Sequence, residues 1–215
     1  MRKFRAVLLV TAAAAAAILG ACEGQVQTRL DNSIGLATYQ NLGLIERKPI
    51  GVGLVVDEEV RAAAVDVKTH NINFRMAVGE ALVSRLMYAL VLQFDRVQLL
   101  EQPTLPADGS LDTVMVVTLK DLDATVNISP KWNTVATESS GWIEVEAILK
   151  DSGGQIVWVG TSRAEAEASQ ESIMVAGAQD AGVAMNRAIE TTVARLVNQM
   201  AISSSLREFV SRRGA

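Results

Sequence analysis

The sequence predicts an α+β fold: a two-layer sandwich in which a mainly antiparallel sheet is covered by two helices. Two long segments, 77–94 and 179–201, repeat apolar residues at the spacing of a helix. Several shorter segments are continuously apolar, or alternate apolar with polar residues, which indicates strands. The 215 residues are enough for one such domain with its own core.

The first strand is expected at 50–56, a continuous apolar run that follows Pro49. The acidic run at 57–59 ends this strand and is typical of a solvated turn or the start of a short helix. The segment 64–76 alternates in places and is expected to hold a further strand, with a turn at 71–73.

The first helix is expected at 77–94, where the apolar residues form one broad face. This face contains Val78, Ala81, Leu82, Leu86, Ala89 and Leu90. A short strand at 96–100 follows the helix. The next segment, 102–110, contains two prolines and a glycine and is therefore expected to be a loop.

Residues 111–128 are expected to form a long strand whose apolar pattern slips by one position halfway. Met115, Val117 and Leu119 share one face, and the later apolar residues share that face only if one residue is extra. A β-bulge near Lys120-Asp121 would bring both sets to the core side.

The polar segment 129–141 contains Pro130 and is expected to be a loop. It also contains Lys131 and Trp132. Because an exposed tryptophan is a common binding anchor, Trp132 is a candidate partner contact, with Lys131 as a charge at its rim.

A hairpin is expected next, with strands at 142–149 and 155–168 joined by a glycine-containing turn at 151–154. Trp142 and Trp158 lie on its two strands. We expect both tryptophans to pack in the core, under a helix.

The last helix is expected at 179–201. Its apolar stripe contains Ala181, Met185, Ala188, Ile189, Thr192, Leu196 and Met200. The serine-rich, basic segment 203–215 is expected to be a frayed C-terminal tail.

The N-terminal residues 1–21 have the features of a secretory signal peptide. A basic start precedes an apolar run at 6–19, which is too short to span a bilayer as a helix. The run ends at Leu19-Gly20-Ala21-Cys22. This sequence resembles the lipobox of bacterial lipoproteins: a branched apolar residue, two small residues and a cysteine.

In that family the cysteine is joined to diacylglycerol, the signal peptide is cut before it, and the new amine is usually acylated. The resemblance implies that Cys22 is lipidated and that its acyl chains hold the protein in a bilayer. Residues 22–48 then hold the lipidated cysteine and a tether with a reach of about 27 Å. The α+β domain at 49–202 and the tail at 203–215 follow.

Glu23 follows the cysteine. In lipoproteins of enteric bacteria an aspartate at this position marks retention in the inner membrane, and glutamate is a weaker signal. We therefore expect the periplasmic face of the outer membrane, with the inner membrane as the alternative.

The composition argues against several functions. The formal net charge is −4, from 20 Lys and Arg against 24 Asp and Glu, which disfavours a nucleic-acid partner. One cysteine and one histidine, His70, leave little material for a metal site, a cofactor ligand set or a catalytic dyad. We therefore expect a protein that is not an enzyme and binds no metal or cofactor.

The lipobox, the order of elements and the size together resemble the small α/β lipoproteins that serve as accessory factors in the cell envelope. Examples are the lipopolysaccharide-assembly lipoprotein that plugs an outer-membrane barrel and the curli-secretion lipoprotein. The resemblance implies a non-enzymatic accessory or assembly role beside a larger envelope protein complex. The alternative is a periplasmic carrier or sensor of a small apolar or lipid ligand, bound between helix and sheet.

Overall fold

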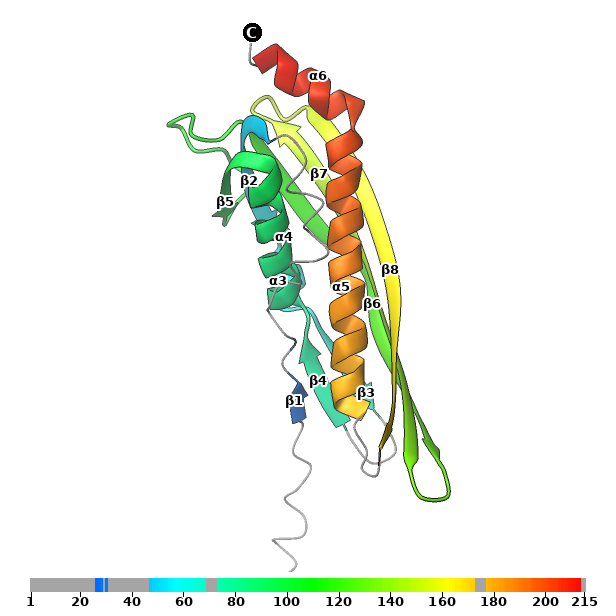
Figure 1. Ribbon diagram of the computed structural model, residues 1–215. Helices are drawn as coiled ribbons and strands as arrows, with labels where there is room; N and C mark the ends of the chain where they lie inside the picture. Colours follow the sequence, from blue (N-terminus) through cyan, green and yellow to red (C-terminus); the bar gives the residue numbers. More distant parts are fainter. Residues whose placement is uncertain (1–25, 29, 31–46, 69–72, 173–176, 214–215) are drawn as a thin grey trace, which may run out of the picture.

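The computed structural model describes residues 26–28, 30, 47–68, 73–172 and 177–213. They form two sheets and a layer of helices (Figure 1). In chain order the elements are β1 (Val26–Thr28), β2 (Lys48–Val56), α3 (Glu58–Arg61), β3 (Ala64–Lys68), β4 (Asn73–Ala77), α4 (Gly79–Gln93), β5 (Phe94–Leu100), β6 (Thr113–Pro130), β7 (Val135–Asp151), β8 (Ile156–Ser172), α5 (Gly177–Ile202) and α6 (Ser204–Arg213).

The main sheet has five strands in the order β5-β2-β6-β7-β8. The three long strands β6, β7 and β8 are antiparallel, whereas β2 pairs in parallel with both β5 and β6. The parallel pairing of β2 with β5 arises because α3, β3, β4 and α4 form a long crossover between them. The expected α+β sandwich is confirmed.

A second, three-stranded sheet has the order β1-β4-β3. β3 and β4 pair antiparallel, and β1 adds to β4 in parallel, with Val26 opposite Phe74. The strand expected within 64–76 is therefore a pair of strands. The turn expected at 71–73 lies mostly outside the described residues.

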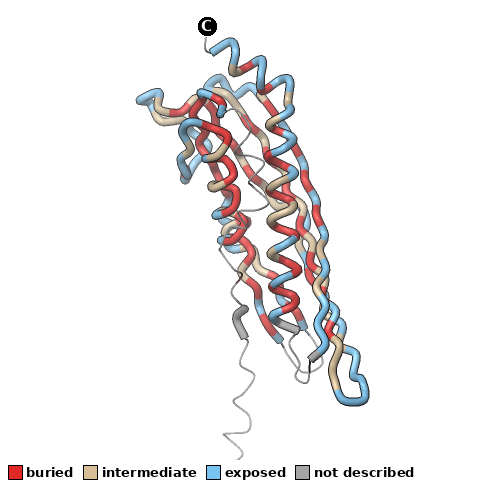
Figure 2. The backbone as a smooth tube through the Cα atoms, viewed as in Figure 1, coloured by how far each residue is buried: buried red, intermediate tan, exposed pale blue. Residues whose placement is uncertain are grey.

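Helices α4 and α5 lie side by side on one face of the main sheet (Figures 1 and 2). The apolar faces predicted for them are confirmed, since Leu82, Leu86, Ala89, Met185, Ile189 and Leu196 are all buried. The two helices are also joined by a buried hydrogen bond, which Gln93 Nε2 donates to the Val197 carbonyl over 3.0 Å.

The bulge expected in the long strand is confirmed. The β6–β7 register shifts between Leu119 and Asp121, so Lys120 is the extra residue. Met115 before the shift and Ala124 after it are both buried, while Asp123 is exposed. One inserted residue therefore keeps a single strand on the core over its whole length.

The prediction of a loop at 129–141 is wrong. β6 continues to Pro130 and β7 begins at Val135, so the connection is only the turn at 131–134. The inward positions of the first part of β7 are buried but carry small side chains, because α5 packs closely there. These positions are Thr137, Ser139 and Gly141.

The prediction of a frayed tail at 203–215 is also wrong for most of that segment. Ser204–Arg213 forms α6, which lies across one end of the molecule with Leu206 and Phe209 buried. Arg213 Nη1 forms an ion pair with Asp112 Oδ1 at 3.1 Å.

Candidate functional site

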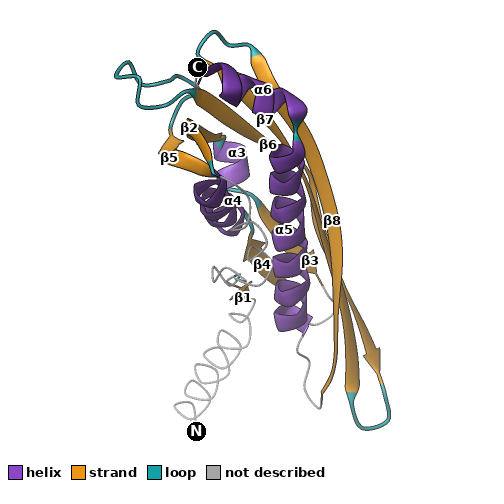
Figure 3. Ribbon diagram, turned by 45° about the horizontal axis from the view of Figure 1, so that its top comes forward, coloured by secondary structure: helices purple, strands orange, loops and turns teal. Residues whose placement is uncertain are grey.

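Strands β6 and β7 continue beyond the start of α5 as a long hairpin, and β8 accompanies them (Figures 1 and 3). We call this projecting part the arm. It consists of Ala124–Pro130, the turn 131–134, Val135–Gly141 and Ala166–Ser172, which are in register with one another. The arm holds the candidate residues Lys131 and Trp132.

The turn at the tip of the arm is held by contacts from two strands. The Lys131 backbone N–H donates to the Thr134 carbonyl over 2.8 Å. The Glu171 carboxylate, on β8, accepts hydrogen bonds from Lys131 Nζ at 2.8 Å and from Thr134 Oγ1 at 2.7 Å. These hydrogen bonds, with the charge of Lys131, lower the pKa of Glu171.

Trp132 projects from this turn and is 97% exposed. The expectation of an exposed tryptophan in a loop is thus confirmed, and the expected loop shortens to a tight turn around it. Lys131 is engaged with Glu171, so it acts as a brace of the turn as well as a charge beside the indole. The structure brings the two candidate residues together at the most distal point of the arm (Figure 1).

Among the described residues, no helix covers the face of β6–β8 that is opposite α5 (Figure 3). We call this face the outer face. The strand register aligns its side chains in rows across the three strands. Successive rows are Asp121, Glu144 and Arg163; Asp123, Trp142 and Glu165; Thr125, Ser140 and Glu167; and Asn127, Glu138 and Ser169.

Trp142 lies on this outer face, so its expected place in the core is wrong. Its Nε1–H donates to Asp121 Oδ2 over 3.1 Å. The cause is parity: along β7 the odd-numbered positions face α5 and the even-numbered positions face outward. Trp158, in contrast, is 6% exposed and packs in the core as expected.

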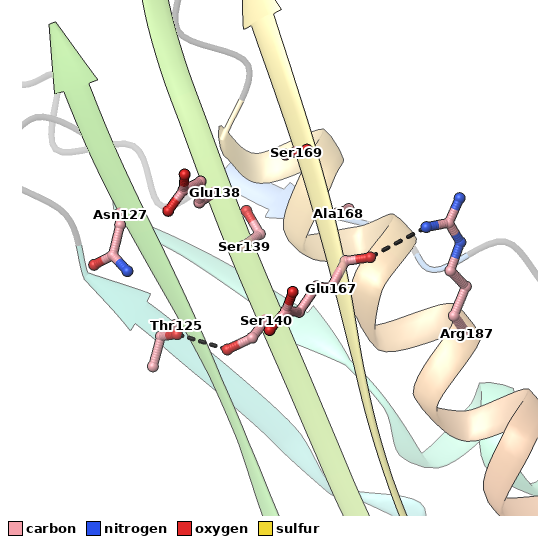
Figure 4. Close-up of a pocket in the computed structure, with 9 residues that line it drawn as sticks. All are labelled: Thr125, Asn127, Glu138, Ser139, Ser140, Glu167, Ala168, Ser169 and Arg187. Atoms are coloured by element: carbon pink, nitrogen blue, oxygen red, sulfur yellow. Dashed lines mark hydrogen bonds between the residues drawn. The ribbon is translucent and has the colours of Figure 1, made fainter.

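A hollow of about 630 Å³ lies at the arm (Figure 4). Its lining is mostly hydroxyl, amide and carboxylate groups. The lining residues are Thr125, Asn127, Glu138, Ser139, Ser140, Glu167, Ala168, Ser169 and Arg187. Thr125 Oγ1 and Ser140 Oγ are hydrogen-bonded at 2.8 Å. This surface can hydrogen-bond polar groups and attract cations, and the sequence signal for it was the charged alternation along 163–167.

The free edge of β8 is covered by side chains from α5. Arg187 Nη1 donates to the Glu167 carbonyl at 3.1 Å, and Arg195 Nη1 to the Arg163 carbonyl at 2.6 Å. Gln199 Nε2 donates to the Thr161 carbonyl at 3.1 Å. These groups occupy carbonyls that an added strand would need, one within the arm at Glu167 and two before it at Arg163 and Thr161.

Other features expected from the sequence fall elsewhere. Cys22 and His70 lie outside the described residues. In the part of the chain that the structure describes, no group of three or more histidine, cysteine, aspartate or glutamate side chains is placed to hold a metal ion. Within the same part, no helix is both long enough and apolar enough to cross a membrane.

No family model matches the sequence, and no curated protein matches it. Among solved structures, the chain is similar to a “putative neuraminyllactose-binding hemagglutinin homolog” from Helicobacter pylori, with 12% identity, a TM-score of 0.48, and coverage of 87% of this chain and 98% of that one. A “putative lipoprotein” from Caulobacter crescentus has 12% identity, a TM-score of 0.34, and coverage of 82% and 97%. A minor lipoprotein from Acinetobacter baumannii has 14% identity, a TM-score of 0.33, and coverage of 79% and 95%. All three TM-scores are below 0.5.

Proposed function

We propose that the protein is a bacterial lipoprotein, held by an acylated Cys22 on the periplasmic face of the outer membrane. In this proposal it is a non-enzymatic accessory factor that contacts a larger envelope protein complex through the arm. The lipobox at 19–22 supports the anchor. The projecting arm, with its uncovered outer face, supports the contact.

The observation that carries the accessory role is the outer face of β6, β7 and β8 from Asp121 toward the tip of the arm, over which no described helix lies. A sheet in a two-layer sandwich buries one face, and the other is free to meet a partner. Here the free face is hollowed and has carboxylates in each of its rows. Because Arg187, Arg195 and Gln199 close the β8 edge between Thr161 and Glu167, the outer face is the accessible surface along that stretch of the sheet.

The charge of the outer face indicates the chemistry of the partner. Asp123, Glu165 and Glu167 are exposed, and near them Arg163 lies within 4 Å of both Asp121 and Glu144. A surface with this excess of negative charge favours a partner that presents lysine or arginine side chains. An anchored protein also meets a membrane-bound partner at high effective concentration, so weak contacts suffice.

The carrier alternative would place an apolar ligand between helix and sheet. In the described residues that layer is filled by core side chains, among them Val145, Ile189 and Leu196, each fully buried. No observation therefore favours this alternative over the accessory role.

The test of the contact is affinity purification of the tagged protein from detergent-solubilised envelopes. The triple variant Asp123→Asn/Glu165→Gln/Glu167→Gln removes three charges from the outer face. We expect it to recover several-fold less of the partner and to show a weaker dependence of recovery on salt. Equal recovery would exclude the outer face as the contact.

The matched control carries the same charge change on exposed residues far from the arm, at Glu58, Glu59 and Glu208. Replacing these three with glutamine is expected to leave recovery unchanged. A loss in the control as large as in the triple variant would show a general charge effect and would contradict a specific contact.

The test of the anchor is mass spectrometry of the mature N-terminus. We expect an acylated peptide that begins at Cys22, and we expect Cys22→Ser to leave an uncut precursor or a protein released from membranes. An unmodified peptide that begins at residue 21, 22 or later would overturn the anchor.

The non-enzymatic character is tested at His70, the single histidine of the sequence. We expect His70→Ala to leave partner recovery and thermal unfolding nearly unchanged. A strong loss of function with intact folding would place a ligand-binding or catalytic site near residue 70.

A further inference from the structure

The anchor and the fold together determine which end of the molecule faces the bilayer. This step depends on the proposed lipidation of Cys22. Cys22 precedes Val26 by four residues. An extended chain spans at most about 3.6 Å per residue, so the acylated cysteine lies within about 14 Å of Val26. Because Val26 pairs with Phe74, the tether is much shorter than the reach of about 27 Å expected for an unpaired segment.

Val26 and the tip of the arm lie toward the same end of the molecule. Both views show β1, the start of α5 and the 131–134 turn toward one end, whereas α6 lies at the other (Figures 1 and 3). The short tether therefore holds the end that carries the arm tip against the bilayer, with α6 pointing away from it.

The arm also reaches beyond the start of α5. Gly141 packs against Met185, which gives a common reference point for strand and helix. From Gly141 to Val135 the strand runs six residues, or about 20 Å at 3.3 Å per residue. From Met185 back to Gly177 the helix runs eight residues, or about 12 Å. Among the described residues, the turn with Trp132 is thus the part that projects furthest at this end (Figure 1).

The chemistry of the tip fits a lipid headgroup layer. Trp132 is a single exposed indole beside exposed polar neighbours, Lys131 and Asn133. Among the described residues, the other large apolar side chains with high exposure all lie outside the arm: Val91, Leu99, Ile156, Val159, Val183 and Ile202. A protein hot spot is normally surrounded by further packed contacts, whereas tryptophan is enriched at the membrane–water interface, where its ring lies at headgroup level.

The charges of the arm are compatible with this position. Lys131 and Glu171 neutralise each other at the turn. Glu138 lies three residues beyond Val135, about 10 Å further along the strand, which exceeds a Debye length of about 8 Å at physiological salt. An upright molecule therefore keeps the acidic outer face away from anionic headgroups.

From this geometry we propose that the Trp132 side chain is a second contact to the bilayer. It lies at headgroup level, next to the acyl anchor, and holds the body upright on the membrane. The outer face then points sideways, along the membrane surface, toward the proposed protein partner.

The experiment uses the full-length acylated protein in vesicles of phosphatidylethanolamine and phosphatidylglycerol, with and without brominated acyl chains that quench nearby tryptophans. We expect quenching in the wild type and its loss in Trp132→Phe. Trp142→Phe is the matched control and should keep the quenching, because Trp142 lies on the outer face, hydrogen-bonded to Asp121. Thermal unfolding checks that each variant is folded.

The outcomes separate the proposals. Equal quenching in the wild type and Trp132→Phe would overturn the lipid contact alone. A second pair of results would also overturn the lipid contact: acrylamide quenches Trp132 equally with and without vesicles, and Trp132→Ala loses the protein partner. The tip of the arm would then be a protein contact. An unacylated Cys22 would overturn the proposed anchor and this inference together.

Discussion

Gly141 of β7 lies directly beneath Met185 of α5: a Cβ atom at Gly141 would come within 3.1 Å of the Met185 Cα. The absence of a side chain lets the helix pack close to the sheet at the base of the arm. We predict that Gly141→Val destabilises the fold by about 1–3 kcal/mol, because the added atoms force backbone to move. Urea denaturation measures this change.

The matched control is Ala136→Val, which adds similar atoms to the outward side of the same strand. It is expected to change the free energy of unfolding by less than about 0.5 kcal/mol. Similar midpoints for Gly141→Val and the wild type would show that α5 does not need this close approach.

The covering of the β8 edge leads to a prediction about self-association. In the variant Arg187→Ala/Arg195→Ala/Gln199→Ala, the Glu167, Arg163 and Thr161 carbonyls lose their side-chain donors. An exposed edge pairs readily with another strand, so we expect concentration-dependent dimers or larger species by analytical ultracentrifugation.

Arg212, exposed on α6, supplies a control for the loss of one of the two positive charges. Arg212→Ala should sediment like the wild type. If the edge variant also sediments like the wild type up to high protein concentration, the side chains of α5 do not protect the β8 edge.

The core shared by the two predicted helices could be predicted from the sequence because apolar residues recur there at helical spacing. Leu86, Ile189 and Leu196 follow this rule and are buried. The bulge at Lys120 could also be predicted, because a single extra residue is enough to explain the slip in the apolar pattern.

The first part of β7 could not be predicted in the same way. Its inward positions hold Thr137, Ser139 and Gly141, and a polar alternation resembles a loop when the close packing of α5 is unknown. The same error placed Trp132 in a long loop. Its exposure could be predicted, but the projecting arm that carries it depends on pairing between distant segments.

The tail shows a similar limit. Leu206 and Phe209 are isolated apolar residues in a polar segment, so local pattern predicts fraying. Their burial depends on where the end of α5 lies relative to the sheet, which is a tertiary relationship.

Burial of α4 allows a quantitative test of the core. Leu86 has no exposed surface, and we predict that Leu86→Ala lowers the free energy of unfolding by about 2–5 kcal/mol. Denaturant titration measures it. Val91→Ala, at a position of α4 that is 45% exposed, should cost far less, and equal losses would contradict the packing.

The brace at the arm tip should depend on pH. Because hydrogen bonds and Lys131 lower the pKa of Glu171 below its usual value of 4.5, the carboxylate form is favoured in the fold. The brace is complete above that usual value and is lost as the pH falls through the lowered pKa. We expect the amide resonances of Lys131 and Thr134 to shift in this acidic range. Glu171→Gln should abolish that titration, and its persistence in the variant would assign the shift to another group.

The last prediction concerns α6. The sequence pattern alone indicates a frayed tail there, whose deletion would not affect stability. Leu206 is fully buried, Phe209 is 8% exposed, and Arg213 pairs with Asp112, whose other oxygen accepts from the Gly51 N–H at 2.7 Å. Burying two such side chains contributes about 3–6 kcal/mol, so a chain that stops after Ser203 should unfold at a much lower denaturant concentration. Arg213→Ala should lose less than about 1 kcal/mol, because the ion pair is partly exposed. A chain that stops after Arg213 is the control and should match the wild type. If the chain that ends at Ser203 matches it too, α6 does not stabilise the fold.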